Sequence, residues 1–230
     1  MSTVKNDQKK VNYFKQNGTT TVVGIALLIL GGILLVWGWS YISYIIMCVS
    51  ILGGLGCLLF GTLTRASEKD MDAELEHQLR ELDINPGRDL KMGSRLLAGV
   101  SPEVVEGYEY KQGVMLRRDK NSKLRSSQYT RAVFYPQEKK LLVRYRMVSL
   151  ISPQSTEKTL EIPYAAIDSI GLVQEERSLT FGKQNFAVTA VTLELKWGTT
   201  HRLSVPTRSN LRTEEFLQRL QKHIAAAKSE

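Results

Sequence analysis

The chain has 230 residues and a formal net charge of +8. Residues 66–230 carry 26 basic against 22 acidic side chains, a balance too even for the dense basic surface of a dedicated nucleic-acid-binding protein. The two cysteines, Cys48 and Cys57, both fall in one apolar run, which excludes a disulfide framework, and their spacing predicts no metal site.

Two apolar runs near the N-terminus, residues 21–37 and 41–63, contain no charged side chain and no histidine. One continuous helix over both runs would be about 65 Å long, roughly twice the ~30 Å hydrocarbon core of a bilayer. We therefore expect a short N-terminal tail over residues 1–20 and a transmembrane hairpin of two helices over residues 21–64. The alternative, a cleaved signal peptide, is disfavoured because a second full-length run follows at once with no small-residue cleavage site between them.

Basic residues flank the two runs, whereas the connection between the runs carries no charge. The flanking residues are Lys5, Lys9, Lys10 and Lys15 before the first run, and Arg65 and Lys69 after the second. Cytoplasmic flanks of transmembrane helices are rich in lysine and arginine. The sequence thus predicts a multi-pass protein of the plasma membrane with both termini in the cytoplasm.

Small residues recur along the second run at intervals of four, namely Gly53, Cys57 and Gly61. Such a strip lets another helix approach closely. The first run offers Gly24, Gly31 and Gly32 as counterparts, so we interpret the strip as packing between the two spans. Contact between two copies of the chain, as a homo-oligomer, is the alternative.

Residues 65–102 form the expected link between the hairpin and the rest of the chain. Leu75, Leu79 and Leu82 follow helical spacing over residues 67–83, and the remaining positions there are mostly acidic. Helices that lie on a membrane surface are usually basic, so this one is expected to stand off the bilayer or to pack on protein. A short coiled-coil stalk is the alternative, and Pro86 is expected to end the helix.

From residue 103 onward the apolar pattern changes to alternation, which indicates half-buried antiparallel strands. The predicted strands cover residues 104–110, 114–118, 128–135, 139–150, 159–163, 170–174, 188–197 and 201–205. A closing amphipathic helix over residues 210–227 places Phe216, Leu217, Leu220 and Ile224 on one apolar face, which is expected to dock on the strands.

Residues 160–170, with the sequence LEIPYAAIDSI, are similar to a phrase found in bacterial pleckstrin-homology (PH) families, which are often fused to transmembrane helices. Together with the strands and the closing helix, the segment makes the chain resemble these families from residue 103 to about residue 224. The resemblance implies an α+β protein in which a PH-like antiparallel β-barrel or sandwich over residues 103–230, capped by the C-terminal helix, follows the transmembrane hairpin.

One loop between two predicted strands concentrates basic residues, and these are Arg117, Arg118, Lys120, Lys123 and Arg125. In PH domains that bind inositol phospholipids, a first hairpin loop ending in K-x-R grips the phosphates, and residues 123–125 have that form. The resemblance thus implies a site for an anionic lipid headgroup or a partner. A solvated hairpin tip is the alternative, and Arg144 and Arg146, on a face expected to be exposed, would extend the patch or only solubilise the sheet.

Catalysis finds little support in the sequence. The histidines His77, His201 and His223 are scattered, and no nucleophile or acid stands at a recognisable spacing from them. We therefore expect no catalytic residues, no metal and no cofactor. The leading hypothesis is a membrane-anchored, noncatalytic binding or scaffold protein that engages anionic lipid headgroups or a protein partner, without nucleic acid. The alternative is a structural or accessory subunit of a larger membrane complex, with the transmembrane hairpin as its interface.

Overall fold

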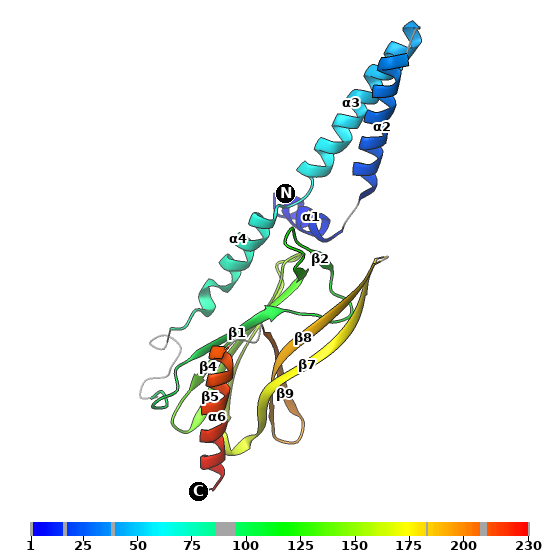
Figure 1. The fold of residues 1–230 in the computed structure, drawn as a ribbon. Coiled ribbons are helices and arrows are strands. Elements are labelled where there is room, and N and C mark those ends of the chain that lie inside the picture. Colours follow the sequence, from blue (N-terminus) through cyan, green and yellow to red (C-terminus); the bar gives the residue numbers. More distant parts are fainter. Residues whose placement is uncertain are drawn as a thin grey trace. The chain divides into compact units, whose positions relative to one another are not determined.

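The computed structural model describes residues 2–15, 18–37, 40–85, 95–182, 184–207 and 211–229, and the chain divides into two compact units. Unit 1 is Met1–Met71 and consists of helices, whereas unit 2, Asp72–Glu230, contains all the described strands (Figure 1). The division between the two units falls between residues 71 and 72.

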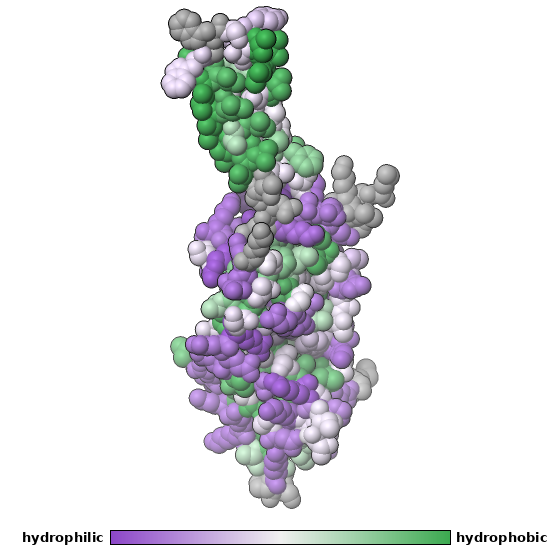
Figure 2. Space-filling view, turned by 90° about the vertical axis from the view of Figure 1, so that its right-hand side faces the viewer, coloured by the Kyte–Doolittle hydropathy of each residue, from purple (hydrophilic) through white to green (hydrophobic). Residues whose placement is uncertain are grey.

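Both apolar runs form helices, α2 (Gly18–Trp37) and α3 (Tyr41–Leu63), which lie side by side (Figure 1). Each is long and apolar enough to cross a membrane. Their large side chains point outward, as in Leu35, 61% exposed, and Leu52, 70% exposed, and Figure 2 shows the resulting hydrophobic surface. This pair corresponds to the predicted hairpin, although Gly38 and Trp39 in its connection lie outside the described residues.

Glycine backbones bring α2 and α3 together. A Cβ on Gly54 would lie 2.8 Å from the carbonyl oxygen of Gly24, so neither position accepts a larger residue without moving the helices apart. Gly61 is buried in this seam, Cys57 is half-buried, and Gly53 is exposed. The seam therefore follows Gly54 rather than its neighbour Gly53, because one residue turns the helix by about 100°.

The basic N-terminal segment also forms a helix, α1 (Ser2–Phe14), which the sequence pattern did not predict. The Asn12 amide donates a hydrogen bond to the carbonyl of Thr64 over 3.1 Å, and the backbone N–H of Ala66 donates to the carbonyl of Lys9 over 3.2 Å. These bonds join α1 to the segment that follows α3, so this segment is not a free tail.

The predicted acidic helix is present as α4 (Glu68–Leu79), extended by a 3₁₀ turn, η1 (Arg80–Leu82). Its start is capped by a reciprocal pair of hydrogen bonds between Ser67 and Asp70. Leu79 and Leu82 are buried against Val148. The helix therefore packs on protein and belongs to unit 2 from residue 72, while the turn expected at Pro86 lies outside the described residues.

Unit 2 contains two larger antiparallel sheets and a small hairpin. The first sheet has the order β1-β4-β5-β6, with β1 Glu103–Tyr108, β4 Gln128–Pro136, β5 Lys140–Ser149 and β6 Ser155–Pro163. The second has the order β7-β8-β9, with β7 Ile167–Phe181, β8 Gln184–Trp197 and β9 His201–Thr207. The hairpin of β2 (Leu116–Arg118) and β3 (Leu124–Ser126) lies in the connection from β1 to β4. A 3₁₀ turn, η2 (Tyr164–Ala166), joins the two sheets.

The C-terminal helix α6 (Leu211–Ser229) closes the core that the two sheets share. The predicted face of Phe216, Leu217, Leu220 and Ile224 is buried in that core. Strands β1 and β9 approach so closely that a Cβ on Gly107 would lie 2.9 Å from the carbonyl oxygen of Pro206. The described strands nevertheless form separate sheets. Of the two expected architectures, barrel or sandwich, a closed barrel is therefore not seen, and the fold is a mixed α and β arrangement of antiparallel sheets.

Candidate functional site

Asp119 builds the turn of the β2–β3 hairpin. Its Oδ1 accepts hydrogen bonds from the backbone N–H groups of Asn121 and Lys123, both over 2.9 Å. Between them Ser122 has φ 61°, a left-handed conformation that a tight turn requires of it. The basic loop is therefore an ordered turn held by a carboxylate, and not an unstructured tip.

The carboxyl of Asp119 is buried, and its environment favours the ionised form. Burial by itself would raise its pKa, but the N–H groups of Lys123 and Asn121 and the guanidinium of Arg125 donate hydrogen bonds to it. These donors outweigh burial, and the pKa of Asp119 lies below its ordinary value. The negative charge is thus retained at neutral pH and offsets part of the positive charge of the loop.

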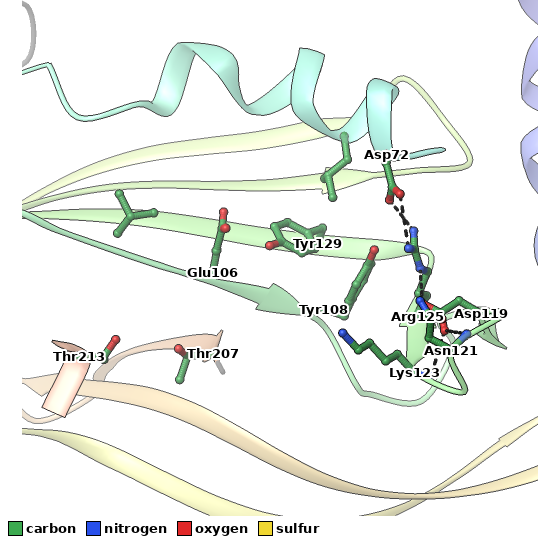
Figure 3. A pocket seen from close by; sticks show the side chains of 12 residues that line it. Asp72, Glu106, Tyr108, Asp119, Asn121, Lys123, Arg125, Tyr129, Thr207 and Thr213 are labelled. Atoms are coloured by element: carbon green, nitrogen blue, oxygen red, sulfur yellow. Dashed lines mark hydrogen bonds and ion pairs between the residues drawn. The ribbon is translucent and has the colours of Figure 1, made fainter. Parts of the chain in front are cut away.

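Arg125 lies between two aspartates (Figure 3). Its Nε is 3.3 Å from Oδ2 of Asp119, and its Nη1 and Nη2 are 2.5 Å and 3.4 Å from the two carboxylate oxygens of Asp72 on α4. The arginine of the K-x-R form is therefore already engaged, and its side chain is only 17% exposed.

Strand pairing divides the basic residues of the hairpin between two faces. Arg117 is paired with Arg125, whereas Arg118 is paired with Leu124 and so points to the opposite face. On that opposite face Leu124 packs in an apolar cluster with Leu179 and Phe186 of the β7–β8 pair. Arg118 lies with its Cζ 6.0 Å from the centre of the Phe186 ring, and it donates a hydrogen bond to the carbonyl of Ser122.

The five predicted site residues therefore do not converge. Arg118, Lys120 and Lys123 are exposed, Arg117 is half-buried, and Arg125 is held by carboxylates. Arg144 and Arg146 were expected on an exposed face, and this expectation is wrong. Both side chains are mostly covered and pair with Glu157, and Arg146 also donates a hydrogen bond to the carbonyl of Gln78 over 2.8 Å.

A cavity of about 430 Å³ opens beside the hairpin (Figure 3). Tyr108 and Tyr129 form part of its wall, with their rings edge to face and 4.9 Å apart. Its lining residues come from α4, β1, the hairpin, β4, β9 and α6, and they are Asp72, Leu75, Val104, Glu106, Tyr108, Asp119, Asn121, Lys123, Arg125, Tyr129, Thr207 and Thr213. The volume lies in the range of small-molecule and headgroup sites, about 300 to 1,000 Å³.

Most of the charge in this cavity is already paired. Glu106 accepts a 2.6 Å hydrogen bond from Arg131, and Asp72 and Asp119 share Arg125. Among the described residues, the ammonium group of Lys123 has no ion-pair partner, and Figure 3 shows its side chain extending along the cavity toward Tyr108. The cavity can therefore accept an anionic group at Lys123, beside the aromatic wall and the amide of Asn121.

Sequence reasoning identified Lys123 but missed the cavity. Tyr108 and Tyr129 are brought together by the pairing of β1 with β4, and Asp72 is 53 residues from its partner Arg125. The local signal that the sequence did carry was Asp119 in the middle of the basic loop. Within the described residues, no group of three or more His, Cys, Asp or Glu side chains could hold a metal ion.

Comparison with known proteins identifies no relative. No family model, no curated protein and no solved structure matches the chain. The likeness to PH families thus remains a prediction based on residues 160–170 and on the order of strands and closing helix.

Proposed function

We propose that this chain is a two-pass membrane protein whose unit 2 is a PH-like, noncatalytic binding module for anionic phosphodiester headgroups. The observation that carries the proposal is the Lys123 ammonium, which faces a cavity whose other charges are paired. A phosphodiester would supply the counter-charge there, and Asn121 could donate a further hydrogen bond from its amide.

The rest of the chain is consistent with this role. Two apolar helices that cross the plasma membrane would hold unit 2 beside the cytoplasmic leaflet, where each nearby cation is worth about 1 kcal/mol of attraction to anionic lipid. The order of four strands, three strands and a terminal helix supports the PH-like assignment. The alternative of a structural subunit has less support, because Gly24 and Gly54 are already used within the α2–α3 pair.

Hydrogen exchange of the full chain in lipid nanodiscs tests the proposal. Amides of residues 116–126 should become more protected when phosphatidylcholine discs are enriched in phosphatidylglycerol, and the protection should weaken as salt is raised. Lys123→Glu should abolish the protection. Lys158→Glu, an equal charge reversal at an exposed position of β6, should retain it.

Two results would contradict the proposal. One is an exchange pattern that does not change with phosphatidylglycerol in the wild-type chain. The other is an equal loss of protection in Lys123→Glu and Lys158→Glu, which would show that the protection depends on net charge alone.

A further inference from the structure

We propose that Asp72 is an internal competitor for the anion that binds at the β2–β3 hairpin, an inference that rests on the proposed function. The Asp72 carboxylate faces Nη1 and Nη2 of Arg125 with its two oxygens, at 2.5 and 3.4 Å. A phosphodiester presents a similar pair of oxygens to a guanidinium. Because one edge of Arg125 cannot hold both, the ligand gains its second cation only when Asp72 leaves.

The two aspartates on Arg125 differ in how firmly they are held. The Asp119 side chain is 4% exposed and also accepts two backbone hydrogen bonds within its own turn. The Asp72 side chain is 55% exposed, and its only described hydrogen bonds are to Arg125. Asp72 is therefore the carboxylate that gives way, while Asp119 keeps the guanidinium in place through Nε.

Asp72 can leave without unpacking the rest of its helix. The contacts of α4 with the first sheet begin at Leu75, which packs with Tyr129 in the cluster of Leu79, and continue to Gln78, which accepts a hydrogen bond from Arg146. Leu75 is three residues from Asp72, about 4.5 Å along the helix axis at ~1.5 Å per residue. Breaking the Asp72 pair thus affects the beginning of this segment and leaves its anchored end in place.

The competition links the ligand to the segment that joins the two units. Helix α4 spans the boundary at residue 72 and follows α3 after residues 64–67. If Asp72 weakens anion binding, anion binding must weaken the Asp72 contact by the same factor, because coupling between two binding equilibria is reciprocal. Anionic lipid at the hairpin would thus loosen α4 where it meets the hairpin.

The test uses the full chain in nanodiscs and the mole fraction of phosphatidylglycerol that gives half-maximal protection of residues 116–126. Asp72→Asn should lower this fraction about two- to fivefold, the range expected for losing a partly exposed ion pair. Glu76→Gln removes the same charge from an exposed position of α4 and should leave it unchanged. In an Arg125→Gln background, Asp72→Asn should bring no gain.

The wild-type chain gives a second readout that needs no variant. Exchange of amides at residues 72–75 should increase as phosphatidylglycerol protects the hairpin. Equal responses of Asp72→Asn and Glu76→Gln, or unchanged exchange at residues 72–75, would overturn the competition. Absence of any wild-type response to phosphatidylglycerol would instead overturn the proposed function. Inorganic phosphate added to phosphatidylcholine discs separates the sources: a response to phosphate with none to phosphatidylglycerol keeps the competition and overturns the lipid assignment.

Discussion

Replacing Leu220 by alanine tests how α6 holds the two sheets together. Leu220 is 0% exposed and shares the main core with Phe134 of the first sheet and Leu195 of the second. The substitution removes three carbon groups, worth about 0.8 kcal/mol each in transfer free energy, and leaves a cavity with its own cost. We expect the free energy of unfolding of unit 2 to fall by about 3 kcal/mol.

Pulse proteolysis in urea measures this change on the full chain in nanodiscs, because only unfolded unit 2 is cleaved rapidly. With a urea dependence of about 2 kcal/mol/M, the unfolding midpoint should fall by about 1.5 M. Leu211→Ala is the matched control, since this leucine of the same helix is 80% exposed and its loss should change stability by less than about 0.5 kcal/mol. Equal midpoint shifts in the two variants would refute the docking of α6 on the core.

Two further predictions concern topology and pH. In a Cys48→Ser, Cys57→Ser background, Ser40→Cys should react with a membrane-impermeant maleimide on intact cells and Lys228→Cys only after permeabilisation; labelling of position 228 from outside would reverse the orientation. Burial raises the pKa of Glu103 above its ordinary 4.5 despite the ion pair of this residue with an arginine of α6. The protonated carboxyl therefore contributes to stability at low pH, and this contribution is lost as the pH rises from 4.5 through the pKa of the folded state. Glu103→Gln should therefore match or exceed wild-type stability at pH 7, measured by urea midpoint, and a loss above about 1 kcal/mol would contradict this.

The elements with strong periodicity or with a long uncharged apolar run were predictable from the sequence. The two apolar runs, the acidic helix and the apolar face of the C-terminal helix are all found near their expected bounds. The strands at residues 139–150 and 188–197 are also confirmed as β5 and β8. The apolar runs were recognisable by their length and lack of charge, and the other elements by the spacing of their apolar residues.

Two elements were missed or predicted too short. Strand β7 runs over Ile167–Phe181, three times the predicted length, but it lies at the edge of its sheet and exposes much of its middle portion. Helix α1 is mostly polar and was not predicted, and it is hydrogen-bonded to the segment after α3. Tertiary contacts determine the structure of such segments, so a local sequence pattern could not have predicted it.

The basic loop shows why charge density in a sequence overstates an anion site. Five cations in nine positions repel one another unless the fold separates or pairs them, and this fold does both: strand pairing sends Arg118 to the far face, and two carboxylates take Arg125. Asp119 could be read from the loop itself, but Asp72 comes from 53 residues away. In the proposed site, the affinity for an anion would depend on Lys123, which has no ion-pair partner among the described residues, and on Arg125, which a ligand would have to take from Asp72. If the proposed competition holds, a loop with the same five cations and no such carboxylates would bind anionic surfaces more tightly, but its binding would not be coupled to α4.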